Sequence, residues 1–366
     1  MMQNTFILSP KLKKNSLLCL TILTLACSNE NHFKPIPVEY PITKKSDHVD
    51  LYWGEEVADP YRWLEDDYAE NTKEWVIAQN KVTFDYLDKI PFREAIRERL
   101  EKVWNYEKVG APFFYGEWTY YFKNDGLQNQ SVLYRSRDEG NEEVFLDPNK
   151  LSEDGSTSLS SIAFTKDGSL FAYAVSVAGS DWRDIYVMDT DSKMLLKDQI
   201  KDAKFTGISW EGKKGFYYST YAQPDGSKLT QAEDVLVFGN DETPKRYVSG
   251  TVTEDGQVLV ISAANSTTGN ELYYKDLNKA GSTIKPIVVN MDNNHGVLDH
   301  QEGWLLVQTN RDAPNNQLVK IDLDNPEQEK WQVLIPEKAQ VMQVSKGGGK
   351  LFATYLKDAI SEIRQF

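Results

Sequence analysis

The sequence has only two cysteines and four histidines among its 366 residues. Both cysteines, Cys19 and Cys27, lie near the N-terminus, so the body of the chain offers no pair that a disulfide could join. The sequence also lacks a long apolar run. Its most apolar stretch, from Leu17 to Ala26, is too short to span a bilayer as a permanent helix.

Basic side chains are scarce relative to acidic ones. The chain has 41 Lys and Arg against 55 Asp and Glu, and its formal net charge is -14. An acidic protein repels phosphate groups, so nucleic acid and anionic membrane surfaces are poor partners. With 40% hydrophobic and 12% aromatic residues, the composition is that of a folded protein of one large or two ordinary domains.

The Gly-x-Ser-x-Gly segment that carries the nucleophile of many serine hydrolases is missing. The nearest approach, residues 207–211, has Ser209 at its centre but lacks the final glycine and falls in a predicted hairpin. A hydroxyl there would have no base beside it, so we predict that Ser209 is not a nucleophile. We predict no catalytic residue in this sequence.

The remaining polar clusters do not predict a metal or cofactor site. His295 and His300 are spaced neither as i,i+4 on a helix nor as i,i+2 on a strand face, which favours a solvated loop and strand end over a metal pair. Acidic runs such as 65–67 and 142–143 are interpreted as solvated faces and turns. The glycines at 347–349 precede a strand, not a helix, which argues against a phosphate loop.

What the sequence does have is a repeated hairpin. Residues 164–175 contain Asp167-Gly168 between two short apolar β-runs, the pattern of a tight hairpin. The same layout recurs at intervals of about 44 to 52 residues, which is typical of a β-propeller blade. The glycines that mark the turns are Gly116, Gly168, Gly212, Gly256, Gly303 and Gly349. The alternative is a sandwich of short strands.

The repeats are not all complete. An outer strand is predicted after three of the hairpins, at 184–189, 270–276 and 316–322. The third repeat passes from residues 228–230 directly to 231–234, so we expect three strands where four are typical. The sixth repeat begins near Val341, and we expect two strands from it.

Residues 1–27 are typical of an export signal, with three lysines, a short apolar core and then Cys27. Residues 24–27 resemble a bacterial lipoprotein box, in which Cys27 would be the lipid acceptor and Cys19 would be removed. Residues 28–42, with three prolines, would form a tether. The expected location is a lipid-anchored protein of a bacterial envelope, in the periplasm or at the outer membrane. The alternative is a soluble periplasmic protein.

Two helices are predicted in residues 43–105. Asp59-Pro60 indicates a turn or helix start. Asn71-Thr72-Lys73-Glu74 has the form of a capping box, followed by apolar residues at helical spacing. Pro91 suits the first turn of the second helix. The fold class that follows is mainly β, with an N-terminal helical arm before a propeller at 106–366.

Residues 59–65, Asp-Pro-Tyr-Arg-Trp-Leu-Glu, together with the segments at 179–182, 231–237, 270–273 and 309–315, resemble the prolyl oligopeptidase family of serine peptidases. The resemblance covers about residues 38–366. It implies a seven-bladed propeller, of which five to six blades are present. It also implies that the helical arm belongs to a peptidase domain whose α/β-hydrolase body and catalytic triad lie beyond Phe366 and are absent from this chain.

The resemblance also implies the partners. Family propellers help to hold and screen short proline-containing peptides, and the loop with Asp181 and Trp182 is the best candidate for a peptide-facing position. The alternative is a blade-stabilising turn in which Trp182 packs against the next sheet. No cofactor is implied, and the oligomeric state is left open.

Three functions remain open at this point. The chain is the N-terminal portion of a peptidase that cleaves after proline, and is inactive alone because the triad is missing. Alternatively, it is a lipid-anchored propeller that binds a peptide without chemistry. The third possibility is a decayed or truncated gene product, in keeping with the short third repeat and the abrupt end.

Overall fold

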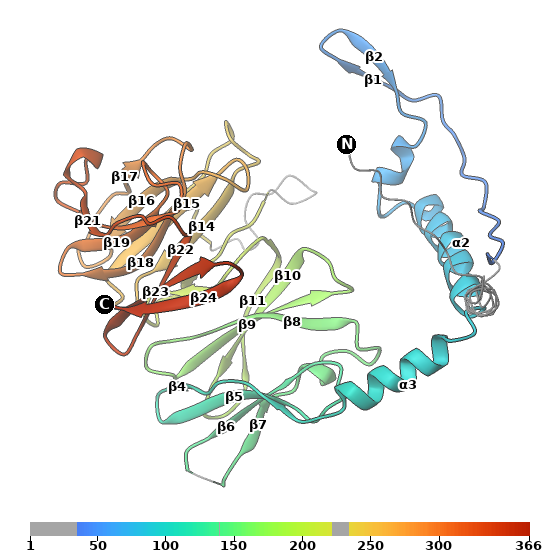
Figure 1. The fold of residues 1–366 in the computed structure, drawn as a ribbon, viewed down its shortest axis with the longest axis horizontal. Coiled ribbons are helices and arrows are strands. Elements are labelled where there is room, and N and C mark those ends of the chain that lie inside the picture. The colour runs from blue at the N-terminus through green and yellow to red at the C-terminus, as the bar shows by residue number, and fades with distance from the viewer. Residues whose placement is uncertain (1–34, 139, 222–233) are drawn as a thin grey trace, which may run out of the picture. The chain divides into compact units, whose positions relative to one another are not determined.

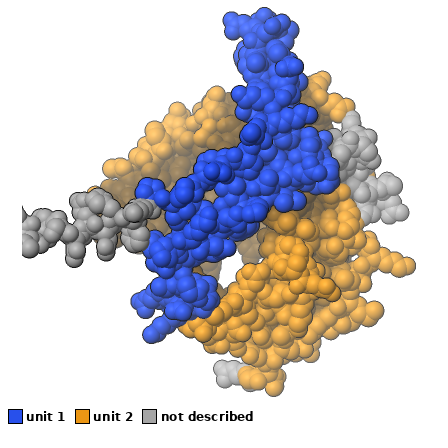
Figure 2. Space-filling view, turned by 90° about the vertical axis from the view of Figure 1, so that its right-hand side faces the viewer, with its two compact units in different colours: residues 1–103 blue, residues 104–366 orange. Residues whose placement is uncertain are grey.

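The computed structural model describes residues 35–138, 140–221 and 234–366. The chain divides into two compact units, residues 1–103 and 104–366 (Figure 2). Within the described ranges, no helix is both long and apolar enough to cross a membrane.

The first unit holds a hairpin and two α-helices (Figure 1). Its elements are β1 (Val49–Tyr52), β2 (Glu55–Ala58), the 3₁₀ helix η2 (Arg62–Glu65), α2 (Glu70–Leu87) and α3 (Arg93–Trp104), the last of which ends at the unit boundary. The sequence did not predict the hairpin. Its turn is formed by Trp53 and Gly54, which both have positive φ, at 50° and 92°.

The Asp59-Pro60 turn is present, but the predicted capping box is wrong. Asp59 accepts hydrogen bonds from the backbone amides of Tyr61 and Arg62, so a turn precedes η2. Helix α2 begins at Glu70 with Ala69 as its N-cap. The Asp66 carboxylate accepts from the Ala69 amide at 3.1 Å, so a side chain before the helix fixes its entry.

The second helix starts later than predicted: Pro91 lies in the turn before α3, which begins at Arg93.

The second unit is mainly β, with six antiparallel sheets among its described residues (Figure 1). We number the sheets 1 to 6 in chain order. Five of them, sheets 1, 2, 4, 5 and 6, have three to five strands and form propeller blades. The prediction of a propeller is confirmed.

Sheet 1 consists of β3 (Lys108–Val109), β4 (Phe113–Tyr115), β5 (Trp118–Asn124), β6 (Val132–Ser136) and β7 (Glu143–Leu146). Sheet 2 consists of β8 (Thr157–Phe164), β9 (Leu170–Val177), β10 (Trp182–Asp189) and β11 (Leu195–Lys204), and follows the 3₁₀ helix η3 (Pro148–Lys150). In the residues that the structure describes, sheet 3 consists of β12 (Ser209–Trp210) and β13 (Phe216–Tyr217).

Sheet 4 consists of β14 (Tyr247–Val252), β15 (Val258–Ala264), β16 (Glu271–Asp276) and β17 (Lys285–Val288). Sheet 5 consists of β18 (His295–Gln301), β19 (Trp304–Thr309), β20 (Gln317–Asp322) and β21 (Gln332–Ile335), with the 3₁₀ helix η4 (Gln328–Lys330) before β21. Sheet 6 consists of β22 (Met342–Gly347), β23 (Lys350–Lys357) and β24 (Ile360–Gln365).

The repeated hairpins are confirmed, because each marker glycine lies between the two strands of an antiparallel pair. Gly168 shows why glycine is needed. Its φ is +73°, and a Cβ there would lie 2.6 Å from the backbone nitrogen of Gly116. The turns of sheets 1 and 2 therefore pack backbone against backbone.

Two strand predictions need correction. The strands predicted as outer ones are β10, β16 and β20, which are third strands, each followed by a fourth. The sixth repeat has three strands, not two, because residues 360–365 pair with β23. The third repeat shows two strands in its described residues, and its predicted gap at 228–234 lies almost entirely outside them.

The core lies between neighbouring sheets. Strand β15 is buried on both faces, so its apolar run at 258–261 does not alternate with polar residues. Val258 and Val260 belong to a cluster that joins sheet 4 to Leu305 and Val307 of sheet 5. Similar clusters join sheets 1 and 2, sheets 2 and 3, and sheets 5 and 6.

The first strands of neighbouring sheets lie close to one another: β8 is near β12, β12 is near β14, and β18 is near β22. One edge of each first strand has no strand partner within its own sheet. Side chains of the preceding sheet bind backbone groups at these edges. Gln130, from the loop before β6, accepts a hydrogen bond from the Leu159 amide at 2.9 Å and donates to the Thr157 carbonyl at 2.8 Å.

The same arrangement recurs at three later first strands. Ser209 accepts from the amide of Val252 at 2.8 Å, Asn270 from that of His295 at 2.7 Å, and Gln308 from that of Val344 at 2.7 Å. We call these four side chains, Gln130, Ser209, Asn270 and Gln308, the edge-binding residues. They replace a strand partner where the sheet ends.

Gln130→Leu tests this arrangement. The substitution leaves the Leu159 amide and the Thr157 carbonyl unpaired, and we expect it to lower the free energy of unfolding by about 2–3 kcal/mol. Urea unfolding measures the loss. The matched control is Gln257→Leu at an exposed turn position. Equal unfolding midpoints for the two variants would show that the edge bonds are not needed.

Candidate functional site

The predicted peptide-facing loop, residues 179–182, is a tightly bonded turn between β9 and β10. Ala178 and Gly179 have positive φ, at 51° and 75°. Ser180 holds the turn from both sides: its carbonyl accepts from the Ser176 hydroxyl at 2.5 Å, and its own hydroxyl accepts from the Trp182 amide at 3.1 Å. These bonds fix the start of β10.

The two predicted residues differ in their surroundings. Asp181 is exposed, and its carboxylate has no hydrogen bond or ion pair with the described residues. Trp182 is half-buried and pairs across the sheet with Lys204, whose Nζ lies 4.8 Å from the centre of the indole. Its observed contact is therefore with its own sheet.

Lys204 extends this contact to a residue that the sequence analysis missed. Its Nζ also lies 5.2 Å from the ring centre of Phe205. Lys204 has no carboxylate partner in the part of the chain that the structure describes. The ammonium group is therefore held by two aromatic faces, an arrangement worth about 0.5–1 kcal/mol at an exposed site.

Phe205 is held in an unfavourable conformation while its ring faces solvent. Its φ is +50°, a region that bulky residues rarely adopt, and such strain costs about 1–3 kcal/mol. Its side chain is nevertheless 46% exposed. Arg183 supports the following residue, donating to the Thr206 carbonyl at 2.8 Å. The fold thus orders this ring without burying it.

Two tyrosines complete the surface. The ring of Phe205 makes edge contacts with Tyr221 at 6.0 Å and with Tyr247 at 5.6 Å between centres. The Tyr221 hydroxyl donates to the Arg246 carbonyl at 3.2 Å, and Tyr247 is 47% exposed. We call Trp182, Phe205, Tyr221 and Tyr247 the aromatic patch. It draws on sheets 2 and 4 and on the chain that follows β13.

The aromatic patch suits a ligand that has an apolar ring attached to a polar backbone. Exposed rings contact flat apolar groups such as a proline ring at low entropic cost. Lys204, next to Phe205 in sequence, offers a cation, and Asp181, next to Trp182, offers an anion. Phe205 could not be predicted from the sequence, because residue type does not reveal a phenylalanine at positive φ.

None of the described side chains forms a nucleophile and base. Ser209 lies in β12, where its hydroxyl accepts from the Val252 amide, so it is one of the edge-binding residues. In the described ranges, the hydroxyl that meets a histidine is that of Thr309, 3.0 Å from His295 Nδ1. Both residues are buried, and the Thr309 hydroxyl also accepts from the Arg311 amide at 3.1 Å, so the pair has a structural role.

The expectation that His295 and His300 lie in a solvated loop is wrong, although both do lie near the ends of a strand. Both lie in β18 and are buried, and their rings have separate partners: Thr309 for His295, and Asp255 for His300 at 2.6 Å. A bulge between Val297 and Asp299 changes the alternation, so both can turn inward. Burial lowers the pKa of His295 to about 4.

The other clusters have structural roles. Glu143 bonds Arg135 at 2.6 Å and Lys193 at 2.9 Å, and these two cations lower the pKa of its carboxyl group even though burial opposes them. Gly348 and Gly349 form the turn between β22 and β23 with φ of +56° and +72°. No group of three or more potential metal ligands occurs in residues 35–138, 140–221 and 234–366.

The buried His295 predicts a loss of stability in acid. The unfolded chain takes up a proton as the pH falls below about 6.5, while the folded chain resists it until about pH 4. The free energy of unfolding should fall by about 1.4 kcal/mol per pH unit in this window, about 3 kcal/mol in total. We expect His295→Gln to remove this part of the pH dependence in urea unfolding at pH 7, 6 and 5.

The control for that measurement is His48→Gln, since the side chain of His48 is 43% exposed. It should leave the pH dependence unchanged. An acid loss of the same slope in His295→Gln and in the unmodified chain would contradict the assignment.

Comparison with known proteins places the whole second unit in one family. A family model described as the prolyl oligopeptidase N-terminal β-propeller domain matches residues 40–366. The prolyl endopeptidase of Elizabethkingia miricola is 47% identical over 97% of this chain and 52% of its own length. That of Elizabethkingia meningoseptica is 48% identical over 90% of this chain and 49% of its own.

Solved structures agree. Prolyl oligopeptidase B from Galerina marginata, bound to a 35mer hydrolysis and macrocyclization substrate, superposes with a TM-score of 0.77 at 31% identity. The superposition covers 90% of this chain and 52% of that one. The chain thus spans about half the length of the curated relatives it matches.

Proposed function

Because the chain belongs to the prolyl oligopeptidase family, we propose that it is the N-terminal propeller portion of a serine endopeptidase that cleaves short peptides after proline. The match of the family model to residues 40–366 carries this proposal. The absence of a Gly-x-Ser-x-Gly segment from the 366 residues supports placing the chemistry outside them. No feature of the described residues favours a separate binding module or a decayed product over this function.

Within that function we assign the aromatic patch to peptide contact. Three observations support the assignment: the exposed and strained Phe205, the unpaired cation of Lys204, and the anion of Asp181 in the adjoining turn. A proline ring on the patch would exclude water from two or more aromatic faces. Lys204 would meet a carboxylate of the peptide.

The proposal predicts binding without turnover. We expect the chain to bind a fluorescent Gly-Pro peptide in an anisotropy titration and to leave a succinyl-Gly-Pro chromogenic substrate uncleaved. Phe205→Ala should weaken peptide binding about tenfold, because it removes the central ring of the patch. Phe114→Ala, which removes a 70% exposed ring from β4, is the matched control.

Two results would overturn these statements separately. Turnover that a serine-reactive phosphonate blocks would show that a serine in these 366 residues has a base. Equal peptide affinity for Phe205→Ala and Phe114→Ala would show that the peptide binds outside the aromatic patch.

We also propose that the ring of the complete protein has seven blades, as in the family, and that five of them are the blades described above. Under this proposal sheet 3, of which two strands lie in the described residues, would belong to a further blade. A structure of the complete protein would test the number, and a ring of six sheets would disprove it.

The proposed location is the bacterial envelope, with Cys27 as the lipid acceptor. Residues 1–34 lie outside the described ranges, so this proposal rests on the sequence pattern alone. In a bacterial host, we expect the chain to incorporate labelled palmitate and Cys27→Ala to lose the label. Cys19→Ala is the control and should keep it. Labelling of Cys27→Ala at the original level would refute the lipoprotein proposal.

A further inference from the structure

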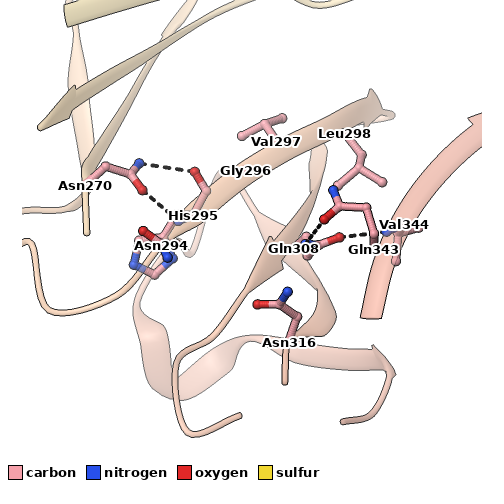
Figure 3. Close-up of a pocket in the computed structure, with 10 residues that line it drawn as sticks. All are labelled: Asn270, Asn294, His295, Gly296, Val297, Leu298, Gln308, Asn316, Gln343 and Val344. Atoms are coloured by element: carbon pink, nitrogen blue, oxygen red, sulfur yellow. Dashed lines mark hydrogen bonds between the residues drawn. The ribbon is translucent and has the colours of Figure 1, made fainter. Parts of the chain in front are cut away.

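A polar cavity lies in sheets 4 to 6, formed by residues other than those of the aromatic patch. Its volume is about 470 Å³, enough for a small organic group or a short stretch of peptide. Figure 3 shows ten lining residues, from the start of β18, from β19 and β22, and from the turns that precede β16 and β20. The lining residues are Asn270, Asn294, His295, Gly296, Val297, Leu298, Gln308, Asn316, Gln343 and Val344.

The lining is polar but uncharged. It contains five carboxamide side chains, and its one ionisable group is His295, whose pKa burial lowers to about 4. The imidazole is therefore neutral at pH 7. Since none of the lining residues carries a charge, an ionised ligand would find no counter-charge there. The lining therefore favours an uncharged ligand.

Hydrogen bonds to the backbone fix the orientation of two carboxamides, those of Asn294 and Asn316. Asn294 Oδ1 accepts from the Gly269 amide at 2.7 Å, which leaves its Nδ2 as a donor. Asn316 Nδ2 donates to the Met342 carbonyl at 2.9 Å, which leaves Oδ1 as an acceptor. A hydrogen bond to a backbone amide or carbonyl thus determines which atom of each side chain remains free to bind a ligand.

Gln343 is oriented through a neighbour. Gln308 Oε1 accepts from the Val344 amide, so its Nε2 must donate, and it does so to Gln343 Oε1 at 3.3 Å (Figure 3). Gln343 Nε2 is then left as a donor. In the described residues, no partner is found for Asn294 Nδ2, Gln343 Nε2 or Asn316 Oδ1.

The cavity therefore presents two donors and one acceptor, beside the apolar side chains of Val297, Leu298 and Val344. A ligand that matches this set has a carbonyl oxygen, an N–H group and a short aliphatic part. We propose that the cavity binds an uncharged amide, either the side chain of Asn or Gln or a backbone amide of a peptide. The site lies outside the aromatic patch and does not depend on peptidase activity.

Buried polar atoms nearby favour an occupant. Thr309 Oγ1 accepts from the Arg311 amide and can give its proton to His295 Nδ1, which leaves His295 Nε2 as a donor. Nε2 is buried and has no hydrogen-bond partner among the described residues. An unpaired buried donor costs about 1–3 kcal/mol. A carbonyl oxygen in the cavity, with a small movement of the ring, could recover part of that cost.

The test uses the full chain and two probes of nearly equal shape. N-acetyl-asparagine amide carries the proposed group, and N-acetyl-aspartate amide replaces its side-chain NH₂ with a charged oxygen. We expect the asparagine probe to bind more tightly in an NMR titration, and Asn294→Asp and Gln343→Glu each to weaken it about tenfold. Both variants keep the oxygen that accepts the structural bond.

N-methylacetamide, a model of the backbone amide, distinguishes a backbone amide from an Asn or Gln side chain as the ligand. Loss of its binding in the same two variants would assign the cavity to backbone amides. A response to the asparagine probe alone would assign it to Asn and Gln side chains. Asn278→Asp, in an exposed loop outside the lining, is the control and should bind as the unmodified chain does.

Three outcomes would overturn the proposal. The first is equal binding of the aspartate probe and the asparagine probe together with no binding of N-methylacetamide. The second is unchanged affinity in Asn294→Asp and Gln343→Glu. The third is tighter binding of a polyol such as glycerol that the same variants abolish, which would assign the cavity to hydroxyl-rich ligands. Peptide binding at the aromatic patch, measured with Phe205→Ala, is a separate readout, so each proposal can fail alone.

Discussion

The propeller depends on hydrogen bonds that side chains make to the open edge of each first strand. Within its own sheet, a first strand has a partner on one side only, and buried backbone groups on the other side need hydrogen bonds. The edge-binding residues supply them from the preceding sheet, as Gln130 does for β8 and Gln308 does for β22. Apolar packing brings neighbouring sheets together, and these directional bonds set their register.

Charged groups reinforce the same boundaries at the other end of the first strands. Lys346 of β22 bonds Asp299 of β18 at 2.7 Å and Glu254 of the sheet 4 turn at 2.5 Å, while His300 bonds Asp255 of that turn. Three sheets are thus linked by a few side chains. Because exposed ion pairs contribute little and buried ones require good geometry, we assign these pairs mainly to alignment of the sheets.

The sequence was a good guide to local structure and a poor one to contacts between sheets. Asp167-Gly168 predicts a hairpin because the turn needs only positive φ at a glycine, and the recurring spacing then predicts the propeller. The burial of His295 depends on Thr309 and Trp331, which no local pattern connects to it. Phe205 was missed because its importance lies in its backbone conformation and not in its neighbours in sequence.

The amide cavity follows from the same edge chemistry. A carboxamide has an oxygen and an NH₂ group, and a single edge bond uses one of them. Asn294 and Asn316 each use one group to hold a neighbouring backbone, and Gln343 uses one to hold Gln308. The unused groups line one cavity in sheets 4 to 6, because structural bonds between these sheets are needed there. A hydroxyl side chain, such as that of Ser209 between sheets 3 and 4, has no second polar atom to offer a ligand. A cavity with several free amide groups is therefore expected where carboxamides connect the sheets.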